Sequence, residues 1–236
     1  PLSDDDFLTA YRAERAADDS IFYPDDLERV WRKLAPKLGL PATDKAAIGF
    51  RQSVAQWPAF PDSVEALRRL KKHFKLVATT NTQRWAVGNF ERTLEMPFDW
   101  SVTSDDTGTE KPDPKYFEWF RAMLAKHGIS QAENLHVAQS QYHDIGIAKR
   151  TGWKTCWIER RAGQKGFGGT LAVKEITQPD WHFTSLAQLV DAVERLAPEL
   201  AGKLGKRPYY VGMVTTANGR HFDVLGHRWD GLLILE

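Results

Sequence analysis

The feature that most constrains the fold of this chain is the alternation of short apolar runs with helical segments between Pro58 and Gly205. The apolar runs are typical of buried strands and lie at residues 75–79, 100–103, 134–138, 154–159 and 181–184. Helices are expected around them, at residues 63–73, 83–94, 114–127, 145–151 and 186–204. Such alternation predicts an α/β domain with a Rossmann-like parallel sheet and helices on both of its faces.

The segments on either side of this domain have other patterns. Residues 1–57 are helical throughout, with helices expected at 4–17, 24–38 and 44–56 and no strand candidate between them. Residues 206–236 differ again, because a strand candidate at 209–215 is followed by the turn signal TANGR and by apolar runs at 222–225 and 231–235. The sequence therefore predicts a helical domain over 1–57, an α/β domain over 58–205 and a separate C-terminal segment over 206–236.

Composition excludes several classes of partner. With 32 basic and 31 acidic residues, the chain has no charge excess that would favour nucleic acid or an acidic membrane surface. No apolar run approaches the roughly 20 residues of a membrane span. Cys156 is the only cysteine, which excludes an internal disulfide framework and favours a reducing, cytoplasmic location. We expect Cys156 itself to be a small buried hydrophobe.

The stretch LHVAQSQYHDIGIAKRTGW, residues 135–153, carries the first candidate site residues. Ligands of open α/β sheets bind at the carboxyl ends of strands, which is where Gln139, Ser140 and Asp144 are predicted to lie. Only one of the three is a carboxylate, and Mg²⁺ prefers hard oxygen ligands that include one or two carboxylates. The other interpretation of Asp144 is a helix N-cap without further function.

Two further segments are expected at the same edge of the sheet. Thr80 and Asn81 follow the apolar run at 75–79, where a hydroxyl and an amide can bind an anion, or can cap the helix that begins near Gln83. In EKPDPKYF, Lys111 precedes a proline that holds it in an extended loop, from which it can direct its charge at a carboxylate. The other interpretation of Lys111 is a solvated surface lysine.

Together these segments resemble the second, third and fourth motifs of the haloacid dehalogenase superfamily, with Thr80, Lys111 and Asp144 in the required order. The resemblance covers residues 58–161 well and implies that residues 1–57 are the helical cap of this fold. The phosphatase branch of the superfamily carries an acidic residue five positions before Asp144, for Mg²⁺, and this chain has Gln139 there. The stretch is more similar to the 2-haloacid dehalogenase branch, which implies that no metal or other cofactor is needed.

The resemblance also implies roles for individual residues. An aspartate would attack the halogen-bearing carbon, and water would hydrolyse the resulting ester. Lys111 would keep that aspartate ionised, since a cation within about 4 to 6 Å favours the carboxylate form. Asp144 would hold Lys111 and position the water.

The expected substrate contacts come from both parts of the fold. Thr80 and Asn81 would bind the substrate carboxylate or the halide, and Ser140 and Gln141 would complete the polar pocket. Arg12 matches the place where the cap of dehalogenases provides an arginine for the halide, with Arg15 and Arg32 as alternatives or a solvated helix face as the simpler explanation. Tyr116 could form a wall of the pocket, whereas its neighbours Phe117, Trp119 and Phe120 are expected in the core.

The nucleophile is the main departure from the family pattern. The superfamily carries it near the N-terminus, on a strand of four apolar residues followed by Asp, two residues, Gly and Thr, and this chain begins directly in the cap. The run FDVLG at 222–226 has Asp and Gly at the required separation, with His227 in place of Thr. A second register places Gly231 on the glycine and Arg228 on the aspartate.

Asp223 is therefore the predicted nucleophile, and Asp230 is the second choice. The segment 206–236 would then be a displaced first core strand, as in a circularly permuted chain, which is tolerable because domain termini often lie close together. The other interpretation is an unrelated C-terminal hairpin.

Three functions are compatible with these residues: a metal-independent hydrolase acting on a small 2-haloacid or a similar organic acid, a Mg²⁺-dependent phosphatase of the same fold, and a catalytically silent binding protein. The sequence favours the first, because of Gln139 and the cap. A small molecule is thus the expected partner. The apolar faces of the cap helices, which include Val30, Leu34 and Ile48, could pack on each other or on a second subunit, and the latter would give a homodimer.

Overall fold

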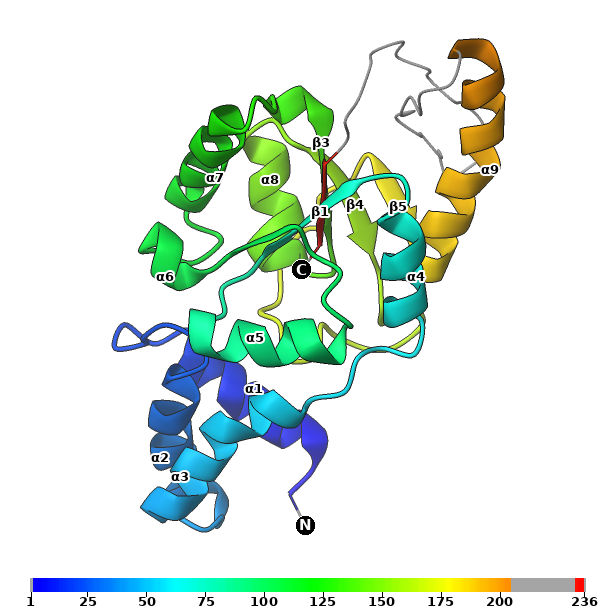
Figure 1. Ribbon diagram of the computed structural model, residues 1–236. Coiled ribbons are helices and arrows are strands. Elements are labelled where there is room, and N and C mark those ends of the chain that lie inside the picture. Colours follow the sequence, from blue (N-terminus) through cyan, green and yellow to red (C-terminus); the bar gives the residue numbers. More distant parts are fainter. Residues whose placement is uncertain (1, 205–231, 236) are drawn as a thin grey trace.

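A computed structural model describes residues 2–204 and 232–235 of the chain (Figure 1). It shows a parallel sheet enclosed by helices, with a group of three further helices beyond the carboxyl ends of the strands. This confirms the predicted α/β fold with a helical cap. The strand candidates at 209–215 and 222–225 lie outside the described residues.

Within residues 2–204 and 232–235 the sheet has six strands in the order β2-β1-β6-β3-β4-β5, and every neighbouring pair is parallel. In chain order the strands are β1 (Lys75–Thr79), β2 (Trp100–Val102), β3 (Asn134–Ala138), β4 (Lys154–Ile158), β5 (Trp181–Phe183) and β6 (Leu232–Leu235). β6 comes from the end of the chain and pairs with both β1 and β3, Leu233 being in register with Leu76 and with Leu135. The centre of the sheet is thus completed by the C-terminal segment.

Helices cover both faces of the sheet. α4 (Ser63–Leu70) and α9 (Leu186–Leu204) lie on one face, and α7 (Pro114–Lys126) and α8 (Gly146–Arg150) on the other (Figure 1). α5 (Arg84–Thr93) and the short α6 (Ser104–Thr107) lie at the cap side of the sheet. Leu76, Val137 and Cys156 face α4 and α9, because side chains alternate between the two faces of a strand.

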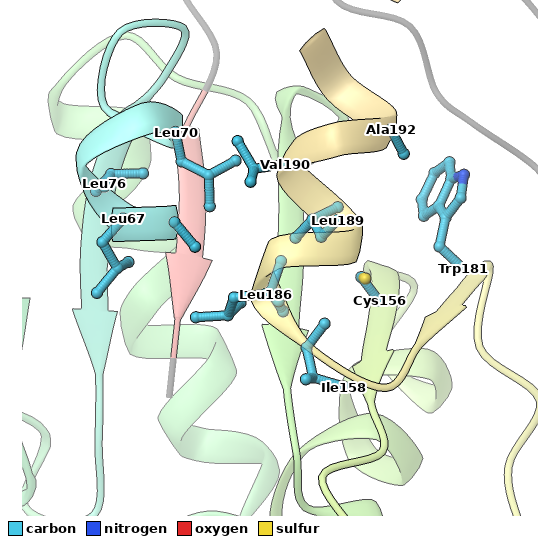
Figure 2. Close-up of a cluster of buried hydrophobic side chains, with 12 residues drawn as sticks. Leu67, Leu70, Leu76, Cys156, Ile158, Trp181, Leu186, Leu189, Val190 and Ala192 are labelled. Carbon is cyan, nitrogen blue, oxygen red and sulfur yellow. The ribbon is translucent and has the colours of Figure 1, made fainter. Parts of the chain in front are cut away.

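The cluster beneath α4 and α9 is the larger part of the core. Figure 2 shows Leu67 and Leu70 of α4 and Leu189 of α9 against the strands. Each such side chain contributes roughly 1.5 to 3 kcal/mol when it is fully buried. Cys156 lies within this cluster, as expected, and its burial raises the pKa of the thiol, so it behaves as a hydrophobe rather than as a nucleophile.

The cap consists of α1 (Asp4–Arg15), α2 (Asp26–Leu38) and α3 (Asp44–Gln52), the last extended by the 3-10 turn Ser53–Gln56. Ser3 and Thr43 cap α1 and α3 by accepting a backbone N–H in the first turn. Val30 and Leu34 are fully buried inside the cap, whereas Ile48, predicted on the apolar face of the next helix, is 39% exposed. The apolar faces therefore pack largely on each other.

Polar contacts join the cap to the core. The backbone N–H of Tyr23 donates to Glu110 at 2.7 Å, and the Arg15 guanidinium lies 3.6 Å from the same carboxylate. Gln83 accepts a hydrogen bond from the backbone N–H of Asp25 at 3.1 Å. Since Glu110 immediately precedes Lys111, the cap is fixed next to the predicted site. None of the helices in the described ranges combines the length and the hydropathy needed to cross a bilayer.

Candidate active site

The site is built around an ion pair between Lys111 and Asp144. Lys111 lies in the loop between α6 and α7, and its Nζ is 2.8 Å from Asp144 Oδ1, both side chains being 0% exposed. The same ammonium donates to the backbone carbonyl of Thr79, at 2.8 Å, at the carboxyl end of β1. Two of the three predicted motifs are thus in direct contact, and Lys111 is not a solvated surface lysine.

Asp144 does not cap a helix, so that interpretation is wrong. The cap is Ser140, whose Oγ accepts from the backbone N–H of His143 at 2.9 Å. Asp144 lies inside the π-helical turn Gln141–Ile145 that leads into α8. A buried carboxylate needs charge compensation, and the ammonium of Lys111 provides it.

His136 is a third member of the cluster, and it was not predicted. It lies on β3, is 1% exposed, and its Nε2 is 2.9 Å from Asp144 Oδ1. The second oxygen, Oδ2, is buried and has no hydrogen-bond partner among the described residues. The only sequence signal for His136 was a polar residue within the apolar run of β3, which is also typical of a core histidine.

Asn81 and Thr80 do not cap α5, whose N-cap is Gln83. The Asn81 amide binds the backbone of Lys111 at both ends, since Oδ1 accepts from its N–H and Nδ2 donates to its carbonyl, each at 2.8 Å. Thr80 Oγ1 donates to Thr82 Oγ1 at 2.9 Å. Asn81 therefore positions Lys111, while Thr80 shapes the loop after β1.

Tyr116 is buried in the wall behind Lys111. Its ring centroid is 5.4 Å from Lys111 Nζ, and its hydroxyl donates to Val102 O at 3.1 Å. Phe117 and Phe120 are in the core, as predicted. Trp119 is 37% exposed, so the prediction of a core position was wrong for this residue.

The remaining predicted residues contact the long loop between β4 and β5. Gln141 Nε2 donates to Thr177 O at 3.3 Å, and its Oε1 accepts from the backbone N–H of the same residue at 3.1 Å. Arg12 of the cap donates to the carbonyl of Gly168 and, at 3.2 Å, to Thr9 Oγ1. Gln141 and Arg12 therefore fix parts of the loop 159–180, which begins at the carboxyl end of β4 and returns to its amino end, where Asp180 contacts Thr155.

The two alternative arginines are engaged inside the cap or at its boundary with the core. Arg15 forms ion pairs with Asp26 and Glu110. Arg32 forms ion pairs with Glu28 at 2.6 Å and Asp44 at 3.1 Å. Of the three arginines, Arg12 is the one that contacts the loop 159–180.

The described residues do not form a magnesium site. Asp144 is bound by Lys111 and His136, and Gln139 Oε1 accepts from Thr170 Oγ1 at 3.4 Å. Across residues 2–204 and 232–235, no three His, Cys, Asp or Glu side chains converge to hold a metal ion. The predicted nucleophile Asp223 and the second choice Asp230 lie outside the described residues.

Known proteins share this sequence and this arrangement of elements. The family model of haloacid dehalogenase-like hydrolases matches residues 25–158. A glyceraldehyde 3-phosphate phosphatase of Pyrococcus furiosus is 28% identical over 57% of this chain and 54% of its own length. (S)-2-haloacid dehalogenase 4A of Burkholderia cepacia is 25% identical over 63% of this chain and 58% of its own length. The chain thus spans little more than half the length of these curated relatives.

Solved structures agree on the fold. The L-2-haloacid dehalogenase of Xanthobacter autotrophicus with chloropropionic acid covalently bound superposes with a TM-score of 0.64 at 18% identity, over 83% of this chain and 87% of that one. At this identity the match supports the fold alone. Since the family model spans more than half of the sequence, from α2 of the cap to the end of β4, the chain belongs to the haloacid dehalogenase-like hydrolase family.

Proposed function

We propose that the chain is a metal-independent hydrolase that releases halide from a small 2-haloacid. The observation that carries the proposal is the segment after β3, where Gln139, Ser140 and Gln141 are uncharged and the single carboxylate, Asp144, is already bound by Lys111 and His136. A divalent cation would need further acidic ligands here. A nucleophilic carboxylate needs a nearby cation, and Lys111 supplies one.

The proposed reaction has two steps. A carboxylate oxygen of the enzyme attacks C2 of the substrate, the carbon–halogen bond breaks, and halide leaves with the bonding electrons. Water then attacks the carbonyl carbon of the enzyme ester, the 2-hydroxy acid leaves, and the released proton goes to a base. The balance is one 2-haloacid and one water consumed, with one 2-hydroxy acid, one halide and one proton formed.

In this scheme the described residues stabilise charge and hold the reactants. Lys111 stabilises the attacking carboxylate, for which Asp223 is the candidate, and Asp144 positions the water. Ser140 and Thr80 are the candidate hydroxyl donors for the substrate carboxylate, and Thr80 would have to exchange its present acceptor, Thr82 Oγ1, for the substrate. Arg12 provides a cationic site for the halide where the cap meets the loop 159–180.

A small cavity beside Gln139 lies on the side of the sheet covered by α4 and α9, and neither Lys111 nor Asp144 lines it. This cavity has a volume of about 100 Å³ and is lined mainly by apolar side chains, with Gln139 and Arg160 among its polar neighbours. Pockets for drug-sized ligands are larger, roughly 300 to 1,000 Å³.

A phosphatase is the second candidate, because the Pyrococcus furiosus relative is a glyceraldehyde 3-phosphate phosphatase. It would require Mg²⁺ and additional carboxylates close to Asp144. The two candidates can be separated by the leaving group and by the effect of a chelator.

The test is to measure halide release from a panel of 2-chloro and 2-bromo acids, and phosphate release from small phosphate esters, each with EDTA and with added Mg²⁺. We expect halide release that EDTA leaves unchanged. Phosphate release that depends on Mg²⁺ would establish the phosphatase instead. No turnover of either panel would favour a binding protein.

A further inference from the structure

We propose that His136 is a positioning residue for Asp144. His136 fixes one oxygen of the Asp144 carboxylate, and the other oxygen is left to accept a proton from the hydrolytic water. The contacts of His136 are seen in the structure, whereas the role of the water rests on the proposed function. The alternative is that His136 is a core side chain whose contact with Asp144 has no effect on turnover.

The imidazole is held from two directions. Its backbone lies within β3, in register with Thr155 of β4 and Ile234 of β6, so the position of its Cβ is determined by the sheet. The ring of Phe117 packs edge-on against it, with centroids 5.3 Å apart and an interplanar angle of 72°. With both backbone and ring fixed, Nε2 has little freedom to leave Asp144 Oδ1 at 2.9 Å.

The contact with Asp144 determines which ring nitrogen of His136 carries the hydrogen. An ionised carboxylate only accepts hydrogen bonds, so the Nε2 atom that contacts Oδ1 has to carry a hydrogen. Lys111 Nζ, at 2.8 Å from the same oxygen, already supplies the compensating charge. A neutral imidazole therefore suffices, and it suits a side chain that is only 1% exposed.

The two oxygens of the Asp144 carboxylate are therefore bound differently. Oδ1 receives two donors, from Lys111 and from His136, while Oδ2 is buried without a hydrogen-bond partner among the described residues. A buried anionic oxygen is costly unless it accepts a hydrogen bond. We infer that Oδ2 is the oxygen that accepts the proton from water as the ester is hydrolysed, and that His136 holds the carboxylate in the orientation required for this.

The test compares His136→Phe, which removes the donor, with His136→Gln, whose amide nitrogen can occupy the place of Nε2. We expect His136→Phe to lower kcat for halide release about 10- to 100-fold, as for the loss of a hydrogen bond to a charged group, with KM changed less than about twofold. His136→Gln should recover most of the loss. The control Phe120→Leu changes the core cluster that contains Phe117, the ring that packs on His136, and leaves the His136–Asp144 contact in place.

Two further measurements distinguish a positioning role of His136 from a role in core packing alone. If hydrolysis is the slowed step, mass spectrometry of acid-quenched His136→Phe should show more of the substrate-derived ester on the protein than wild type does. Nitrogen-15 NMR of wild type should show the Nε2–H tautomer of His136, with shifts that change in Asp144→Asn. The wild-type tautomer can be read without activity and without any variant.

An active wild type whose kcat is unchanged by His136→Phe would overturn the inference, and so would an Nδ1–H tautomer. A wild type that releases no halide would instead contradict the proposed function, while NMR would still decide whether His136 donates to Asp144.

Discussion

At the scale of single residues, the buried ion pair between Lys111 and Asp144 dominates the site. We expect Lys111→Met to destabilise the protein by about 3 to 5 kcal/mol, because it leaves a buried carboxylate without its counter-charge. The double variant Lys111→Met/Asp144→Leu should recover much of that loss, since neither charge of this pair remains. Urea unfolding at pH 7 measures both values.

The exposed Lys115, from the same segment, provides a control, and Lys115→Met should change the free energy of unfolding by less than about 0.5 kcal/mol. If the double variant is as unstable as Lys111→Met, the cost does not come from the uncompensated carboxylate of Asp144.

Sequence reasoning identified some of these residues better than others. Lys111 and Asp144 were predicted together because their segments resemble two motifs of the haloacid dehalogenase superfamily, and the structure places them in contact. The role of Asn81 could not be predicted, because its partner is a backbone group 30 positions away. His136 was missed for a related reason, since the partner of a histidine in an apolar strand is set by tertiary packing.

At the scale of elements, the start of α2 is held by Asp26. This carboxylate is fully buried, accepts the backbone N–H of Ile21 at 3.0 Å, and forms ion pairs with Arg15 and Arg29. Burial alone would raise the pKa of Asp26, but the hydrogen bonds from Arg29, Ile21 and Arg15 outweigh it and lower the pKa.

A lowered pKa in the folded state has a definite consequence for stability. Asp26 stabilises the protein above the ordinary carboxyl pKa of about 3.9, and this contribution is lost as the pH falls through the lower folded value. We therefore expect Asp26→Asn to cost about 3 kcal/mol at pH 7, and the difference from wild type to shrink toward pH 3. Free energies of unfolding at pH 7, 5 and 3 measure this.

The exposed carboxylate of Asp44, at the start of α3, provides the matched control for this series. Asp44→Asn should cost less than about 1 kcal/mol at each pH. An Asp26→Asn difference that stays constant from pH 7 to pH 3 would contradict the assignment.

The bounds of most elements could be predicted, and β1, β3 and α9 agree at both ends with the expected ranges. The helix expected at 44–56 is α3 followed by a 3-10 turn, and the loop after β3 is partly a π-helical turn. Apolar periodicity does not distinguish such helical geometries. An apolar run such as LLIL does not by itself reveal which strands it will pair with. The resemblance predicted a displaced first core strand within 206–236, and the pairing of β6 with both β1 and β3 is seen in the structure.

At the scale of the whole molecule, the order of the strands along the chain differs from their order in the sheet. β6 is last in sequence and lies between β1 and β3, consistent with segment 206–236 being a displaced first core strand. We expect a circular permutant, with residues 206–236 joined ahead of Pro1 by a short Gly-Ser linker, to unfold cooperatively within a few degrees of wild type. All strand pairings can be kept in this order.

A chain truncated after residue 205 is the control, because it leaves β1 and β3 without the strand that joins them, and it should lose cooperative unfolding. A permutant that fails to fold under conditions where wild type folds would contradict the interpretation of this segment.

The central claim is hydrolysis through an ester on Asp223, and oxygen labelling tests it most directly. After many turnovers of a 2-haloacid in H₂¹⁸O, the attacking water should leave ¹⁸O in the nucleophilic carboxylate. Trypsin releases residues 221–228, HFDVLGHR, in which Asp223 is the only acidic residue. The account predicts a mass increase in this peptide that depends on substrate and persists in EDTA. Label confined to the product, or found in another peptide, would contradict it.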